Sequence, residues 1–336
     1  MQISGPKLSQ LERDFINNYQ GNFPLEARPF ESIAKQLSCT EDKLIETVNN
    51  LKNQKLLSRF GPLYDATRLG GGLTLAAIAV PEDRYESVTE LVNSYAEVAH
   101  NYRREHELNM WFVLATETPE EINQVISSIE KTTGLTVYNF PKQQEFYIGL
   151  WLHLSADGKH TTVPVPLPKE TDTAVDNVQL DDIDRKLISL TQTGLAIEHS
   201  PYQKVANELG ITQLEVIQRL KNMLSNGIIR RIGAVPNHYK LGVTANGMTV
   251  WEVDDNKVAE LGNIIGQLDF VSHCYQRPRH LPMWRYNLLA MVHGANKDEV
   301  HEKAKQIESL LGENCMQHET LFSSAILKKT GLRLAA

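Results

Sequence analysis

The sequence has few cysteines and no long hydrophobic run, and these two absences exclude several classes of protein. Its three cysteines, Cys39, Cys274 and Cys315, have no CxxC spacing, and an odd number cannot form a complete disulfide framework. Reduced thiols are typical of a cytoplasmic protein, which is the location we expect. No run approaches the roughly 18 apolar residues of a membrane-spanning helix, and the N-terminal residues lack an apolar signal region. The sequence therefore predicts neither secretion nor membrane insertion.

Motifs for nucleotide and metal binding are also missing. The Gly70-Gly71-Gly72 run lacks the GxGxxG pattern and a P-loop lysine, so we interpret it as a turn between modules. No closely spaced Cys/His set indicates structural zinc, and we expect no metal ion of the protein's own. The net charge of −7 and the pI near 5.9 argue against nucleic acid as the partner.

What the sequence does contain is an internal repeat. Residues 8–14 lie over residues 180–186 at an offset of 172 (180 − 8), and the offset still holds where Arg59-Phe-Gly61 meets Arg231-Ile-Gly233. A slip of one residue then brings His100 onto His273. Asn109 then matches Asn287 only after five additional residues in the second copy, so the second copy carries an insertion. The chain is a tandem duplication in which one half is locally elaborated.

Each copy has the same predicted order of elements. Three helices followed by a short strand indicate a winged helix-turn-helix, and the strand-helix-strand-strand-helix-strand pattern after it indicates a ferredoxin-like βαββαβ unit. The predicted fold class is therefore α+β, a tandem duplication that forms an internal pseudo-dimer. The proline-rich segment between the copies is predicted to be a semi-extended linker. The predicted domains are winged helix-turn-helix 1 (1–68), ferredoxin-like domain 1 (69–154), linker (155–178), winged helix-turn-helix 2 (179–240) and ferredoxin-like domain 2 (241–336).

The most informative stretch is residues 271–294, where a strand carries functional side chains. Strand alternation predicts that Val271, His273, Tyr275 and Arg277 share one face, with Cys274 on the other. The first copy repeats this face with the same residue types at the same spacing, as Val98, His100, Tyr102 and Arg104. We interpret the recurrence as a duplicated binding surface.

The residue types on these faces suit an acidic ligand. Arginine is a planar, permanently charged clamp for carboxylates, and histidine transfers protons near neutral pH or ligates a metal. Further cationic and aromatic side chains lie nearby in both copies. They are Arg279, His280, Trp284 and Arg285 in the second copy, and Arg103 and His106 in the first. Cations beside aromatic and apolar surface predict a large, flat polyanion such as a porphyrinoid with carboxylate arms.

Two signatures carry a resemblance to a known family. HNYRREHELNMWFVL (residues 100–114) and SHCYQRPRHLPMWRYNLLAMVHG (residues 272–294) resemble the paired signatures of siroheme decarboxylases, which are Lrp/AsnC-like in fold. That family removes the carboxyl groups of the C12 and C18 acetate arms of siroheme, giving 12,18-didecarboxysiroheme. The two signatures commonly lie on separate subunits, and their presence in one chain resembles the fused proteins of heme d1 biosynthesis.

The resemblance implies roles for the residues of both faces. It implies catalytic roles for His273, Tyr275, His100 and Tyr102, with His273 as proton donor or iron ligand. It implies substrate binding by Arg277, Arg279, His280, Trp284 and Arg285 in the second copy, and by Arg103, Arg104 and His106 in the first. The second copy is the expected seat of turnover, because it has the insertion and more cations. Whether His273 or His100 ligates the siroheme iron stays open.

The partners and cofactors follow from the same resemblance. Siroheme and didecarboxysiroheme are the expected ligands, the siroheme iron belongs to the substrate, and no cofactor is required. A homodimer of the whole chain is compatible with the sequence. The alternative function is an Lrp/AsnC-type transcriptional regulator that binds a heme-like or amino-acid effector. The predicted recognition segments are poorly supplied with basic residues, which argues against DNA binding.

Overall fold

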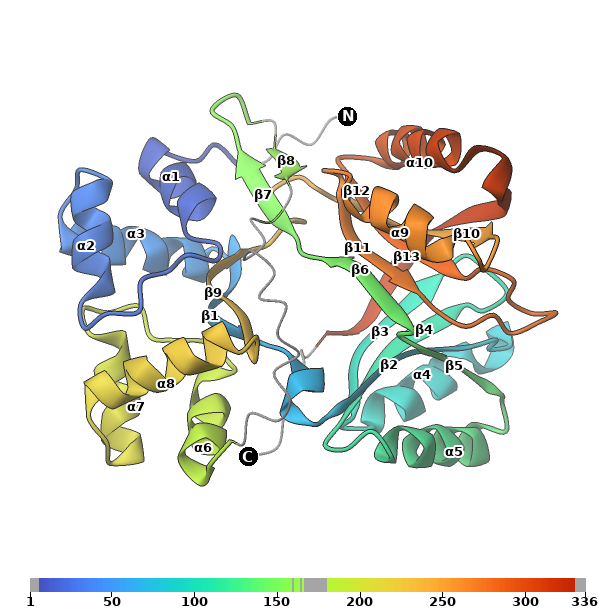
Figure 1. Cartoon of the computed structure of the whole chain (residues 1–336), viewed down its shortest axis with the longest axis horizontal. Coiled ribbons are helices and arrows are strands. Elements are labelled where there is room, and N and C mark those ends of the chain that lie inside the picture. The colour runs from blue at the N-terminus through green and yellow to red at the C-terminus, as the bar shows by residue number, and fades with distance from the viewer. Residues whose placement is uncertain (1–5, 159, 164, 166–179, 330–336) are drawn as a thin grey trace.

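The computed structural model describes residues 6–158, 160–163, 165 and 180–329, and these form a helical half and a sheet-based half (Figure 1). The helical half combines the helix-turn-helix elements of both copies. The other half combines both ferredoxin-like units in one large sheet with helices on two sides. Equivalent domains of the two copies therefore lie next to each other, as in a dimer.

The helix-turn-helix elements begin where the sequence offers side-chain caps. Ser9 Oγ accepts a hydrogen bond from the Glu12 amide, and the Glu12 carboxylate accepts one from the Ser9 amide. Asp181 and Asp184 form the same capping box in the second copy. For the helix-turn-helix of the first copy, the periodicity of the sequence predicts helices over residues 11–19, 30–37 and 40–53, and the observed helices agree with these to within one residue at each end. The six helices are α1 (Gln10–Asn18), α2 (Pro29–Gln36), α3 (Glu41–Asn53), α6 (Asp182–Thr191), α7 (Pro201–Leu209) and α8 (Gln213–Ser225).

The two wing strands pair with each other. Strands β1 (Leu57–Tyr64) and β9 (Ile229–Pro236) form one antiparallel ribbon in which Gly61 lies opposite Gly233. A Cβ atom at Gly233 would lie 2.2 Å from the carbonyl oxygen of Tyr19, so this close approach requires glycine. The sequence predicted one wing for each module, whereas in the described residues the modules share a single ribbon. A lone strand needs a partner for its backbone groups, and the other copy supplies it.

One apolar core joins the two helix-turn-helix modules. Phe30 and Phe60 of the first copy belong to the same buried cluster as Tyr202 and Leu220 of the second. The two modules therefore form a single folded unit, because separating them would expose this apolar surface to water.

The ferredoxin-like units contribute the nine-stranded sheet and four helices. The strands of the first copy are β2 (Gly72–Ile78), β3 (Val98–Arg104), β4 (Met110–Thr116), β5 (Val137–Pro141) and β6 (Gln144–Ile148). Those of the second are β10 (Ala245–Val253), β11 (Val271–Gln276), β12 (Leu288–Gly294) and β13 (Cys315–Lys329). The helices are α4 (Tyr85–Ser94), α5 (Glu121–Thr133), α9 (Val258–Gly266) and α10 (Lys297–Leu311).

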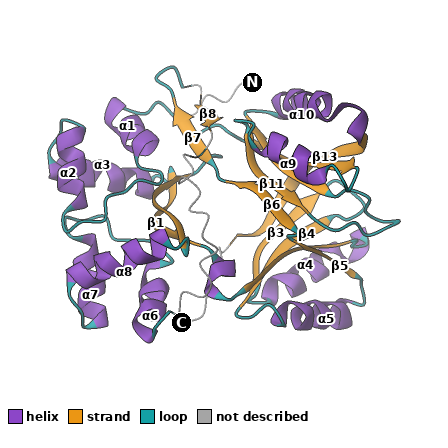
Figure 2. Ribbon diagram, viewed as in Figure 1, coloured by secondary structure: helices purple, strands orange, loops and turns teal. Residues whose placement is uncertain are grey.

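The strand order joins the copies twice. The order is β5-β2-β4-β3-β13-β10-β12-β11-β6, so that β13 pairs with β3 and β6 pairs with β11. Only Lys142 and Gln143 separate β5 from β6, although these strands lie at opposite ends of the order. The sheet must therefore curl until its two ends meet. The helices pack on its outer surface (Figure 2), so the concave surface is not covered by these helices.

Smaller elements complete the described structure. Residues 160–163, in the predicted linker, form β8 against β7 (Trp151–Leu154), while residues 159, 164 and 166–178 of that linker lie outside the described residues. Three short 3-10 helices are η1 (Ala66–Leu69), η2 (Glu82–Arg84) and η3 (Gly312–Asn314). The hairpin docks on α1, where the Asn17 amide side chain donates to the Leu154 carbonyl at 3.0 Å.

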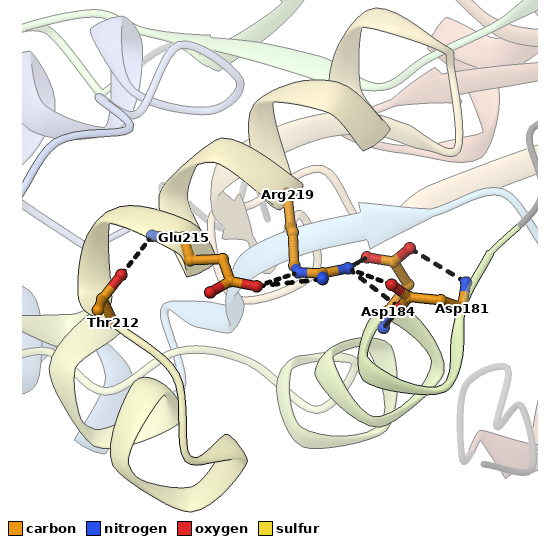
Figure 3. A network of polar contacts seen from close by, with 5 residues as sticks. All are labelled: Asp181, Asp184, Thr212, Glu215 and Arg219. Atoms are coloured by element: carbon orange, nitrogen blue, oxygen red, sulfur yellow. Dashed lines mark hydrogen bonds and ion pairs between the residues drawn. The ribbon is translucent and has the colours of Figure 1, made fainter.

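The central arginine of α8, the second copy's predicted recognition helix, forms ion pairs with carboxylates. Arg219 lies 2.9 Å from Asp181, 2.8 Å from Asp184 and 3.1 Å from Glu215, while Thr212 caps the start of the helix (Figure 3). Hydrogen bonds to these carboxylates raise the pKa of Arg219. Its charge is compensated locally, which reduces its value as a contact to a DNA phosphate.

Candidate active site

The two His-Tyr-Arg faces line one cavity on the concave side of the sheet. The cavity has a volume of about 370 Å³ and contacts six of the eight predicted face residues. They are His100, Tyr102 and Arg104 from β3 and His273, Tyr275 and Arg277 from β11 and the residue after it. The structure therefore brings together side chains that are about 170 residues apart in the sequence, a separation that reflects the duplication.

A β-bulge near the start of each strand modifies the predicted face. In β3, Val98 pairs with Leu114 but His100 pairs with Val113, and β11 repeats this irregularity between Val271 and His273. Val98 and Val271 consequently pack in the helix-side cores. The prediction that these two valines share the histidine faces was wrong, because a bulge shifts strand alternation by one residue. Cys274 lies in the helix-side core as predicted.

Within each face the three side chains keep the same arrangement. The His100 and Tyr102 ring centroids are 6.2 Å apart, and those of His273 and Tyr275 are 6.0 Å apart. The Arg277 guanidinium lies 5.0 Å from the Tyr275 ring centroid. This spacing places a proton-carrying group, a phenol and a fixed cation side by side along the cavity wall.

Each face arginine also reaches across to the other copy. Arg104 donates to the carbonyl oxygen of Leu321 on β13 at 2.6 Å, and Arg277 donates to that of Phe140 on β5. The Nε atoms of both arginines are buried and have no hydrogen-bond partner among the described residues. Burial lowers the pKa of each to about 10, so both remain cations at neutral pH. Unpaired donors on a buried cation favour a carboxylate ligand.

Burial sets the protonation of the other face residues. It lowers the pKa of His100 and of His273 to about 4, so both imidazoles are neutral at pH 7 in the ligand-free cavity. Burial raises the pKa of Tyr102 and of Tyr275, which keeps both phenols protonated. A bound polyanion would favour the protonated imidazoles, because opposite charge stabilises the cationic form.

We expect the folded chain to lose stability in mild acid. Because the histidine pKa is lower in the folded state than the usual 6.5, the unfolded chain binds protons first as the pH falls. The free energy of unfolding should decrease between about pH 6.5 and about pH 4, by about 3 kcal/mol for each such histidine.

Thermal unfolding across this pH range measures the effect, with His100→Asn as the matched variant. The variant should lose less stability on acidification than the parent chain. Equal pH slopes for the two proteins would contradict the low pKa of His100.

Six predicted substrate-binding residues have other contacts and are absent from the residues that line this cavity. Arg279 donates to the backbone oxygens of Arg285 and Val253, and Arg285 lies 3.4 Å from Glu252. Arg103 is held by Glu82 at 2.7 Å. These arginines do not line the cavity, so we do not carry them into the proposed substrate contacts.

The aromatic residues of the insertion join the two copies. His280 Nε2 lies 2.7 Å from the carbonyl oxygen of Asn139 on β5, and Trp284 is 1% exposed in a cluster that includes Trp111 and Phe140. His106 packs edge-on against Trp284, with ring centroids 5.4 Å apart. The insertion therefore packs as a structural element between the copies, where the sequence predicted substrate contacts.

Most charged cavity residues that the sequence analysis missed come from elements outside the signatures. Lys142 lies between β5 and β6, Glu145 lies in β6, and Arg230 comes from the shared ribbon. His238 and Lys329 complete the wall. Five lining cations therefore face one lining carboxylate, Glu145, which lies 2.6 Å from Lys142 and 3.4 Å from Arg230. Arg230 also pairs with Asp65 at 2.8 Å. No spacing in the sequence marks these residues, because long-range strand pairing positions them. Strand alternation in β12 could have identified His293, another lining residue next to β11.

Two other features are absent from the described residues. No group of three or more His, Cys, Asp or Glu side chains is placed to hold a metal ion in that part of the chain. No helix among residues 6–329, apart from the segments left undescribed, is both long and apolar enough to cross a bilayer.

The fold and cavity define a class of protein, a tandem AsnC-like protein whose two ligand-binding domains enclose one cavity. The family profile of the AsnC-like ligand binding domain matches residues 68–147 and 240–328. The profile of the siroheme decarboxylase NirDL-like HTH domain matches residues 12–57 and 184–230. The chain belongs to the siroheme decarboxylase family.

Individual relatives span either the whole chain or one half of it. The siroheme decarboxylase of Hydrogenobacter thermophilus is 31% identical over 94% of this chain and 92% of its own length. The siroheme decarboxylase NirH subunit of Paracoccus pantotrophus is 54% identical over 46% of this chain and 96% of its own length. The crystal structure of siroheme decarboxylase NirDL in complex with an iron-uroporphyrin III analogue has a TM-score of 0.70 at 27% identity, covering 96% of this chain and 93% of that one.

Proposed function

We propose that this chain is a siroheme decarboxylase, a carboxy-lyase that removes the C12 and C18 acetate carboxyl groups of siroheme to give 12,18-didecarboxysiroheme for heme d1 biosynthesis. The observation that carries the proposal is the single cavity with two His-Tyr-Arg faces and five lining cations. The related NirDL structure supports it, since that protein holds an iron-uroporphyrin analogue.

The cations bind the carboxylate arms that do not react. Arg104 and Arg277 are fixed through their backbone contacts and offer their remaining donors to carboxylates. Lys329 adds charge at another point of the wall. Lys142 and Arg230 also line the wall, where they are paired with Glu145 and Asp65. Fixing several arms at once orients the macrocycle, so that one acetate arm lies beside a histidine.

Decarboxylation then needs a proton at the reacting carbon. The bond between the methylene carbon and the carboxylate carbon breaks, CO2 leaves, and the electron pair is delocalised into the macrocycle. We assign the proton that forms the new methyl group to His273 as general acid, with Tyr275 second. His100 and Tyr102 occupy the equivalent positions on the opposite face. General acid catalysis of this kind contributes about 10² to 10⁴-fold in rate.

The proposed chemistry sets the other requirements. Loss of CO2 and gain of a proton involve no external electron donor or acceptor, so no redox cofactor is required. Siroheme and its decarboxylated product are the partners, in the cytoplasm and without a membrane. Both face types lie in one chain, and a homodimer of this chain is compatible with the proposal.

Anaerobic incubation of the full chain with siroheme, followed by mass analysis of the pigment, tests the function. Stepwise loss of two CO2 units is expected, with none after heat denaturation of the protein. Unchanged siroheme under conditions in which it binds would overturn the proposal. The rival function, gene regulation, predicts duplex binding with a steep salt dependence, and the compensated charge of Arg219 argues against it. A gel-shift titration distinguishes the two.

Substitution of Arg277 by Lys should weaken siroheme binding roughly tenfold or more. Lysine has no planar fork, and its single amine cannot serve both the Phe140 carbonyl and a substrate carboxylate as the guanidinium does. Absorbance titration with siroheme measures the affinity. The matched control is Arg285→Lys, since Arg285 pairs with Glu252 away from the cavity. Equal affinity for the Arg277 variant and the parent chain would argue against carboxylate clamping.

A further inference from the structure

His273 belongs to a continuous chain of hydrogen bonds. Its Nδ1 atom lies 2.8 Å from Ser272 Oγ, which lies 2.5 Å from His293 Nε2. His293 Nδ1 lies 2.5 Å from Asn246 Oδ1, and Asn246 Nδ2 lies 3.0 Å from His238 Nε2. Adjacent residues normally point to opposite faces of a strand. The β-bulge between Val271 and His273 changes this alternation, so the Ser272 hydroxyl can lie next to the His273 ring.

With the Asn246 oxygen facing His293 and the amide nitrogen facing His238, one direction of donation along these hydrogen bonds satisfies every group when the imidazoles are neutral. The amide Nδ2 of Asn246 can only donate, so it donates to His238 and leaves its oxygen to accept from His293 Nδ1–H. His293 Nε2 then accepts from the Ser272 hydroxyl. Ser272 Oγ in turn accepts from His273 Nδ1–H. This order leaves His273 Nε2 as the nitrogen without a proton.

Within its described residues, the first copy has no equivalent of the hydrogen bond between His273 and Ser272. The residue equivalent to Ser272 is Ala99, which has no hydroxyl group. The Nδ1 atom of His100 is buried and has no hydrogen-bond partner among the described residues. The two histidines of the cavity are therefore held differently, although their faces have the same residue types.

On the basis of the proposed function, we propose that Ser272, His293 and Asn246 are positioning residues for His273. They hold the ring by Nδ1 and fix its tautomer, so that Nε2 is the nitrogen that gains a proton and delivers it to the substrate carbon. A hydrogen bond to one ring nitrogen commonly decides which nitrogen of a histidine does the chemistry. Ser272 is 1% exposed and is not among the residues that line the cavity, so it acts only through the histidines.

Substitution of Ser272 by Ala tests this role by separating kcat from KM. We expect kcat for CO2 release from siroheme to fall roughly 10- to 100-fold, the usual cost of removing a hydrogen bond that orients a functional histidine. KM and siroheme affinity should not change, because Ser272 does not line the cavity. Ser309→Ala, an exposed serine of α10, is the control. An unchanged kcat in a folded Ser272→Ala variant would overturn the proposal.

A second measurement, on the parent chain, does not depend on activity. Nitrogen-15 NMR of the histidine-labelled, ligand-free chain should show His273 protonated at Nδ1, with its signals assigned by their loss in His273→Asn. Protonation at Nε2 would overturn the proposed polarity. If the parent chain releases no CO2 from siroheme, the proposed function fails, while the NMR result still decides whether the hydrogen-bonded chain fixes this tautomer.

Discussion

Replacing His273 by Ala should lower the rate of CO2 release from siroheme about 10² to 10⁴-fold while leaving the pigment bound. The imidazole is the proposed proton donor, whereas the arginines and lysines of the cavity wall supply most of the attraction for the carboxylate arms. Single-turnover pigment mass analysis measures the rate, and absorbance titration measures binding. Undiminished turnover would remove His273 from the mechanism.

Two further variants sharpen this result. His301→Ala, an exposed histidine of α10 that packs on Phe322, should behave as the parent chain. His100→Ala should lose less activity than His273→Ala, because only His273 is oriented by a hydrogen-bonded chain. Equal losses at both positions would refute this asymmetry, and with it the expectation that the second copy is the seat of turnover.

Replacing Trp284 by Ala should decrease the free energy of unfolding by about 3–5 kcal/mol. The indole is buried between the copies, with its ring centroid 4.9 Å from that of Trp111 and 5.5 Å from that of Phe140. Its removal leaves a cavity in the apolar cluster that joins the two halves of the sheet. Equilibrium unfolding in denaturant measures the change.

The control lies in the same insertion. Leu281 is 70% exposed, so Leu281→Ala should change the free energy of unfolding by no more than about 0.5 kcal/mol. Below its melting temperature, the Trp284→Ala chain should still bind siroheme, since Trp284 does not line the cavity. A variant that is stable but no longer binds siroheme would instead support the direct substrate contact predicted from the sequence.

The sequence by itself determined the local elements and the chemistry of the two faces. Caps such as Ser9 and Asp181 mark helix starts, because the side-chain acceptor and the amides that it satisfies lie within three residues. The His-Tyr-Arg spacing is likewise local, and the duplication doubled it. These features could be predicted because each depends on residues that are close in the chain.

Only the tertiary structure decided that the two faces share one cavity. The curling of the sheet, the pairing of β3 with β13 and the shared β1–β9 ribbon all depend on strands that are far apart in sequence. The same pairings place Arg230 in the wall and bury Trp284 between the copies. Side-chain types and spacing do not specify such contacts, since backbone hydrogen bonds between strands can form with almost any sequence, and packing selects the register.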